Sequence, residues 1–124
     1  MAASLVAIGE AFTKMASDPS RYRPLDPAQP PSARLNILVR ENRLAICWAG
    51  HEGRGGGRKV LDLAVRVLST TPGIGVADAL IVACAIACPT TRRLYTTEAR
   101  LIQSADIRAM GRRGGRDWAI AEAP

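Results

Sequence analysis

The chain has 124 residues, 48% of them hydrophobic and 4% aromatic, so it is long enough for one compact domain and too short for two. Seventeen basic and eleven acidic side chains give a net charge of +6, which favours an anionic partner, nucleic acid first. No apolar run reaches transmembrane length, and no basic segment precedes the apolar residues of the N-terminus. We therefore expect a cytoplasmic protein that does not enter a membrane.

The basic charge comes almost entirely from arginine, because Lys14 and Lys59 are the only lysines. Arginine binds phosphate through a planar, bidentate fork, which suits a nucleic-acid partner. An arginine-rich genome would produce the same bias, and composition does not separate the two explanations.

The cysteines do not form a recognisable framework. Cys47, Cys84 and Cys88 are too few and too irregularly spaced for a set of disulfides. Cys84 and Cys88 lie one helical turn apart in an apolar run, as small buried hydrophobic residues do. A zinc site is not expected, because His51 is the only histidine and no CxxC pair occurs.

The first half of the chain begins with an amphipathic helix, in which Leu5, Ile8, Phe12 and Met15 recur at helical spacing. Asp18 and Pro19 should end this helix. The expected elements are then a proline-rich connector, a helix, a short buried strand and a glycine-rich basic loop, over residues 18–32, 33–42, 44–49 and 50–59 respectively.

The second half alternates helices with short strands. Five residues should form the buried face of its first helix, namely Val60, Leu61, Ala64, Val67 and Leu68. The next helix is apolar almost all round, so it should lie in the middle of the fold and end at Pro89. The expected order is helix 59–69, turn 71–75, helix 77–88, strand 93–96, helix 97–105, loop 112–116 and strand 118–121.

Helices that alternate with short apolar strands indicate an α/β fold, here a sandwich of helices around a short parallel sheet. We expect one domain over residues 1–124.

Asp78 opens the long apolar helix. An acid in the first turn complements the helix dipole, which is a purely structural role. Asp78 also shares a face with Ile81 and Ala85, and a carboxylate at the rim of a buried face needs a basic side chain or a metal as its partner. The sequence favours neither partner over the other.

Glu98 follows the strand that ends at Thr96. Ligands bind at the carboxyl ends of strands in α/β sheets, although Glu98 could equally be an acid of a helix N-terminus capped by Thr97. Two acids, each at the end of a hydrophobic element, suggest a site for a hard cation. Glu10 lies opposite the apolar stripe of the first helix, where a glutamate is ordinarily solvated.

The loop over residues 53–59 invites comparison with a phosphate-binding loop. It lacks the Gly-Lys-Ser/Thr sequence that opens a helix in such loops, because Val60 follows Lys59. Arg54, Arg58 and Lys59 could still hold a backbone phosphate, but a solvated loop is the simpler interpretation.

DALIVACAIA followed by LYTTEARLI resembles the C-terminal half of PIN domains, in which an Asp opens an apolar helix and a later strand ends in Thr-x-Asp. The segment SLVAIGEAFTKM is similar to the PIN helix that carries a glutamate ahead of an apolar stripe. The resemblance implies a three-layer sandwich whose acids hold Mg²⁺ or Mn²⁺ for cleavage of phosphodiester bonds in single-stranded RNA. It assigns Glu10, Asp78 and Glu98 as metal ligands and catalytic acids, with Thr96 as the hydroxyl of the motif.

The chain departs from the family in two places. PIN domains begin with a strand that ends in a first catalytic Asp, and only nine residues precede Glu10 here, so we expect an N-terminally truncated or degenerate version without that strand. Glu98 also stands where the family has Asp, which shifts the carboxylate by ~1.3 Å, and catalysis is sensitive to displacements of that size.

Many prokaryotic PIN proteins are toxins of the VapC type, so the resemblance further implies an antitoxin partner and a homodimer. Two other hypotheses remain: a non-catalytic PIN-like module that binds RNA or a protein, and a remnant that folds only with a partner.

Overall fold

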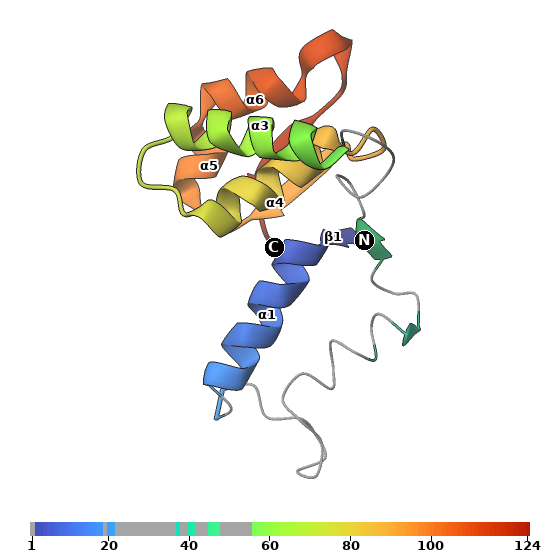
Figure 1. Ribbon diagram of the computed structural model, residues 1–124, viewed down its shortest axis with the longest axis vertical. Coiled ribbons are helices and arrows are strands. Elements are labelled where there is room, and N and C mark those ends of the chain that lie inside the picture. The colour runs from blue at the N-terminus through green and yellow to red at the C-terminus, as the bar shows by residue number, and fades with distance from the viewer. Residues whose placement is uncertain (1, 19, 22–36, 38–39, 42–44, 48–55) are drawn as a thin grey trace. The chain divides into compact units, whose positions relative to one another are not determined.

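The computed structural model describes residues 2–18, 20–21, 37, 40–41, 45–47 and 56–124, and the chain divides into two compact units, Met1–Cys47 and Trp48–Pro124. The described part of the chain is mixed α/β and mostly helical, with two short pairs of parallel strands (Figure 1). Most of the predicted connector, of the second helix and of the glycine-rich loop with His51 and Arg54 lies outside the described residues. Within the described part of the chain, no helix is long and apolar enough to span a membrane.

The N-terminal unit is organised around helix α1 (Leu5–Ser17). Ser4 caps it, because the Ser4 hydroxyl accepts the backbone N–H of Ala7 at 3.1 Å. The helix ends immediately before Asp18, as the Asp-Pro pair predicts. Ile8 is buried and packs against Ala3, Ala11, Phe12 and Met15, which confirms the predicted apolar stripe at the described side chains.

A strand does precede this helix, so the prediction that the chain lacks one is wrong. Strand β1 (Ala2–Ser4) pairs in parallel with β2 (Ala45–Cys47), which lies inside the predicted strand 44–49. The strand has only three residues, and it ends at Ser4 rather than at an aspartate. Sequence periodicity misses it because three residues are too few to show an alternation.

The C-terminal unit begins with α3 (Gly56–Thr70), which packs against α4 (Val76–Ala87) (Figure 1). The prediction placed residues 56–59 in a loop, but they form the first turn of α3. Arginine and lysine are good helix formers, so Arg58 and Lys59 extend the helix that begins at the two preceding glycines.

The buried face of α3 is narrower than predicted. Val60, Ala64 and Val67 are buried, whereas Leu61 is 59% exposed. Successive helical residues are separated by ~100°, so a side chain adjacent to Val60 in sequence lies well away from the contact line. Helix α4 supplies half of the remaining core of this unit through residues Ala79, Val82, Ala83, Cys84, Ala85 and Ile86.

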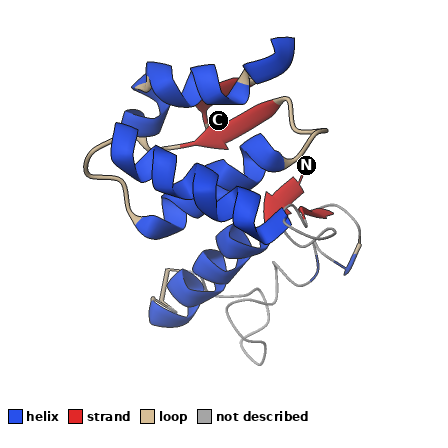
Figure 2. Ribbon diagram, turned by 45° about the horizontal axis from the view of Figure 1, so that its top comes forward, coloured by secondary structure: helices blue, strands red, loops and turns tan. Residues whose placement is uncertain are grey.

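Two short parallel strands complete the C-terminal unit, and Figure 2 shows them among its helices. Strand β3 (Arg93–Thr96) pairs with β4 (Ala119–Glu122), so that Arg93 lies opposite Ala119 and Thr96 opposite Glu122. Both predicted strands are confirmed, the second with a shift of one residue.

The predicted helix 97–105 is two helices, α5 (Ala99–Gln103) and α6 (Ala105–Gly111). Ser104 ends the first and begins the second, because its hydroxyl accepts the N–H of Ile107 at 3.3 Å. A short 3₁₀ turn (Arg113–Gly115) follows, in which Gly114 and Gly115 have positive φ angles. This turn leads directly to Arg116.

Arg116 ties the end of α4 to the start of β4. Its guanidinium donates hydrogen bonds to the carbonyl oxygens of Ile86, Cys88 and Thr91 at 2.6, 2.8 and 2.9 Å. The last carbonyls of a helix have no partner inside the helix, so this side chain satisfies groups that would otherwise be unpaired. It also fixes where the chain enters β3.

Replacing Arg116 by alanine should lower the free energy of unfolding by about 2 kcal/mol, because a charged donor to several carbonyls is lost. Urea denaturation followed by far-UV circular dichroism measures the effect. Arg113→Ala is the matched control, since this exposed side chain makes no hydrogen bond within the described residues. Equal stability of the two variants would contradict the capping role.

Gly111→Ala should destabilise the protein by about 1–3 kcal/mol, the usual cost of overpacking a core. A Cβ at Gly111 would overlap the ring of Trp118, which is fully buried. Gly9→Ala is the control, because Gly9 is exposed in α1 with no atom within 4 Å of the added carbon. That change should leave stability unchanged or raise it by up to ~1 kcal/mol.

Candidate functional site

The site begins where β3 ends. The hydroxyl of the half-buried Thr96 accepts the backbone N–H of Glu98 at 3.1 Å. Glu98 then caps α5, since its Oε1 accepts the N–H of Arg100 at 3.2 Å. The alternative that made Thr97 the cap is therefore wrong, because Glu98 has the extended backbone of a capping residue and folds its own carboxylate back onto the helix.

Arg100 connects Glu98 to the turn that leads into α4. Its Nε lies 3.9 Å from Glu98 Oε1, and its Nη1 donates to the carbonyl oxygen of Gly73 at 2.6 Å. Gly73 has a φ of 84°, a backbone conformation that favours glycine, and a Cβ there would stand 2.6 Å from Arg100 Nη1. Both the backbone conformation and the lack of space therefore favour glycine at this position. Figure 1 shows α5 beside this turn.

Asp78 lies in the first turn of α4, two residues after its first residue, and is half-buried. Gly75 caps the helix without a side-chain hydrogen bond, so Asp78 is the acid nearest to the positive end of the helix dipole. It makes no hydrogen bond or ion pair with another described residue, which leaves its carboxylate oxygens available to a ligand. The basic partner that the sequence allowed for is thus not provided by the residues that the structure describes.

Glu10 is half-buried on α1 and belongs to the N-terminal unit, whereas Asp78, Thr96 and Glu98 belong to the C-terminal unit. Among the described residues, no three histidine, cysteine, aspartate or glutamate side chains form a group that could hold a metal ion. The structure brings Thr96 and Glu98 into direct contact. Asp78 lies on α4, and Arg100 bonds to Gly73 in the turn before that helix.

The electrostatics of the site are mixed. Two carboxylates at helix N-termini offer the oxygen ligands that hard divalent cations prefer. Arg100 supplies a positive charge against Glu98, but the two side chains are 59% and 37% exposed, and such a pair contributes little to stability. Binding of a cation to Glu98 would therefore have to displace only a weak ion pair and one helix-capping hydrogen bond.

Arg100 and Gly73 were not identified as parts of the site from the sequence. They are 27 residues apart, and neither belongs to a motif. A glycine in a turn and an arginine in a helix are too common to signal a contact.

Comparisons of the chain with models of protein families, with curated proteins and with solved structures find no match. Any function therefore has to be argued from the residues and their geometry.

Two substitutions separate the capping role of Glu98 from a role in metal binding. Glu98→Ala removes the acceptor of the Arg100 N–H and should cost about 1 kcal/mol of unfolding free energy. Glu98→Gln keeps an acceptor oxygen, so it should retain most of that stability and still weaken Mn²⁺ binding, measured by isothermal titration calorimetry. Unchanged Mn²⁺ affinity in Glu98→Gln would assign Glu98 to the cap alone.

Proposed function

We propose that the protein is a metal-dependent endoribonuclease with a PIN-like α/β sandwich, which hydrolyses phosphodiester bonds in single-stranded RNA. The observation that carries the proposal is the arrangement at the end of β3. Thr96 holds Glu98 at the N-terminus of α5, and Arg100 ties that terminus to the turn before α4 and Asp78. Acids at the carboxyl end of a parallel strand are well placed to meet a ligand.

The residues present fit a divalent cation in part. Asp78 and Glu98 would hold Mg²⁺ or Mn²⁺ through carboxylate oxygens. Glu10, which the resemblance to PIN domains also assigns as a ligand, belongs to the N-terminal unit. Such an ion, when bound, lowers the pKa of a water molecule and offsets charge on the phosphate.

Each of the protein's own groups has a distinct task in this proposal. Asp78, which has no protein partner among the described residues, is the strongest candidate ligand. Thr96 positions the Glu98 backbone rather than the substrate, because its hydroxyl oxygen already accepts the Glu98 N–H. Arg100 is exposed enough to contact a non-bridging phosphate oxygen as well as Gly73.

The resemblance to PIN domains also suggests the partners and the location of the protein. We propose a cytoplasmic protein that pairs with a second copy of itself and with an antitoxin protein. Leu61 and Val65 support a protein partner, because they stand one turn apart on α3 and are 59% and 61% exposed.

A second candidate function is a non-catalytic module that binds RNA. It is favoured by the guanidinium of Arg100 against Glu98, since a cation already beside a carboxylate opposes metal binding there. The absence of a group of three metal-binding side chains among the described residues is consistent with this alternative as well.

Cleavage of labelled single-stranded RNA, with Mn²⁺, Mg²⁺ or EDTA, tests the first function. Wild-type protein should cleave only with metal, and Asp78→Asn should lose the activity, because its neutral side chain binds a cation far more weakly. The loss of a first-turn acid should lower stability by less than ~1 kcal/mol, so the variant remains folded.

Asp117→Asn is the control, because Asp117 is an exposed acid of the C-terminal unit outside both the candidate site and the hollows along α3. It should cleave RNA like the wild type. Metal-dependent cleavage that survives in Asp78→Asn would refute the assignment of Asp78, and a well-folded wild type without cleavage would favour the binding module.

A further inference from the structure

The arginines of the C-terminal unit fall into two groups. One group donates to backbone carbonyls: Arg100 to Gly73, Arg108 to Ile102 and Gln103, Arg112 to Trp118, and Arg116 to three acceptors. A second group makes no hydrogen bond or ion pair within the described part of the chain, and three of its cations lie on or beside α3, namely Arg58, Lys59 and Arg66. These exposed charges therefore have no structural partner among the residues that the structure describes.

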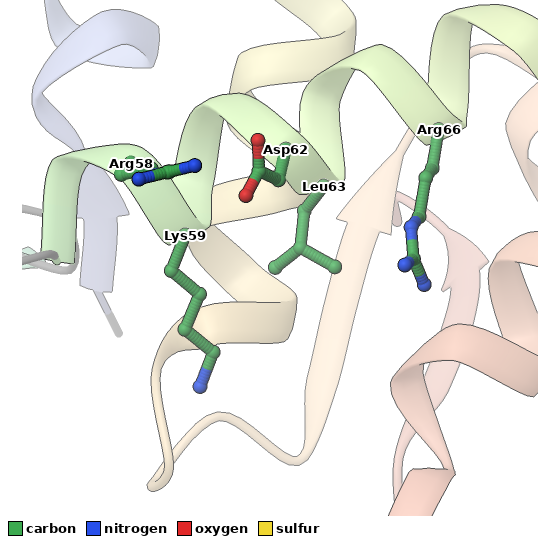
Figure 3. A pocket seen from close by; sticks show the side chains of 5 residues that line it. All are labelled: Arg58, Lys59, Asp62, Leu63 and Arg66. Atoms are coloured by element: carbon green, nitrogen blue, oxygen red, sulfur yellow. The ribbon is translucent and has the colours of Figure 1, made fainter.

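Lys59 and Arg66 form a row along one side of α3. Seven residues separate them, which corresponds to about two helical turns and ~10 Å along the axis. Figure 3 shows the side chains of Lys59, Leu63 and Arg66 extending toward the same side of the helix. Two cations at this separation can contact different phosphates of one strand.

Arg66 also joins two adjacent hollows into one surface. The first, of about 360 Å³, is lined by Arg58, Lys59, Asp62, Leu63 and Arg66 (Figure 3). The second, of about 230 Å³, lies between α3 and α6 and is lined by Arg66, Thr70, Asp106, Ala109, Met110 and Arg113. Together they carry four cations and two aspartates, so the surface is basic.

The chemistry of the lining favours a nucleic-acid strand over a protein. No aromatic residue lines either hollow, and Met110 is buried, so the surface lacks the large apolar anchors of a protein interface. Free guanidinium groups bind phosphate in bidentate geometry. A single row on one helix matches one strand better than the two backbones of a duplex, and without aromatic side chains on which bases stack, binding should be independent of base sequence.

We propose that Lys59, Arg66 and Arg113 form a binding surface for the phosphate backbone of single-stranded RNA, along α3 and across to the turn after α6. The choice of RNA rests on the proposed function, but the surface itself does not, because it uses none of Glu10, Asp78, Thr96 or Glu98. It explains why Arg58 and Lys59, which the sequence placed in a loop, stand at fixed positions on a helix.

Fluorescence anisotropy with a short labelled single-stranded RNA, in EDTA and in the Asp78→Asn background, measures binding without cleavage. The logarithm of affinity should fall with the logarithm of salt concentration with a slope of about −2, since each neutralised phosphate on a single strand contributes about −0.7. The double variant Lys59→Gln/Arg66→Gln should bind several-fold more weakly and reduce the slope to about −0.7.

Two controls test the location of the surface. Arg92→Gln removes one exposed charge just before β3, outside both hollows, and should leave affinity and slope nearly unchanged. Asp62→Asn removes a negative charge from the first hollow and should strengthen binding. The charge-conserving Lys59→Arg/Arg66→Lys should restore binding, which excludes misfolding as the cause of a loss.

The outcomes separate this proposal from the nuclease. RNA binding that weakens in the double variant supports the surface even if the wild type cleaves nothing. Cleavage together with an unchanged slope in the double variant overturns the surface and leaves the nuclease intact. Absence of binding by the Asp78→Asn protein, tighter binding of a duplex of equal length, or equal competition by polyglutamate would also overturn it.

Discussion

The hydrogen bonds of Arg116 hold the C-terminal unit in its arrangement. One guanidinium satisfies the carbonyls of Ile86, Cys88 and Thr91, which lie at the end of α4 and in the turn before β3. Arg116 comes two positions before Trp118, whose ring is buried against Gly111. The start of β3 and the start of β4 are thereby brought to the same place, and the parallel pairing of Arg93 with Ala119 follows. Because the register determines where β3 ends, it also determines where Thr96 presents its hydroxyl to Glu98.

The candidate site has the form of two helix N-termini joined by an arginine. Each N-terminus attracts negative charge, which explains an acid at both positions without any ligand. The two acids differ in what else they do. Glu98 is used by the fold, as the cap of α5 and as a weak partner of Arg100, whereas Asp78 has no partner among the described residues. If a cation binds here, its affinity depends chiefly on Asp78, and Glu98 contributes by giving up a capping hydrogen bond. Arg100, whose Nε lies 3.9 Å from the Glu98 carboxylate, suits a phosphate ligand because its positive charge attracts the negative charge of the phosphate.

The arginines too can be divided into side chains that bond to the protein's own backbone and side chains that are exposed. Composition did not separate a nucleic-acid partner from an arginine-rich genome, because both add arginines. In the structure, four arginines donate hydrogen bonds to backbone carbonyl oxygens, namely Arg100, Arg108, Arg112 and Arg116. A lysine lacks the planar, forked set of donors that a guanidinium provides. The cations on α3 make no hydrogen bond or ion pair within the described residues, so they are among the positive charges available to an anionic partner.

The sequence by itself determined the elements whose pattern is strong: the apolar stripe of α1, the helix that Pro89 ends, the strand Arg93–Thr96, and the position of Asp78 and Glu98 at element ends. It did not determine β1, because three residues are too few to show a period. It also did not determine the exposure of Leu61, because the sequence pattern does not show whether an apolar residue next to a buried stripe is itself buried or exposed. It placed Arg58 and Lys59 in a loop, since glycines mask the start of a helix. Only the tertiary structure decided that Glu98 caps its own helix, that Arg100 meets Gly73, and that Arg116 closes α4. The contacts of Arg100 and Arg116 join residues 27 and 30 positions apart, and only chain folding brings such residues together. The Glu98 cap is local, but the sequence offered Thr97 equally as the cap, and only the backbone geometry separates the two.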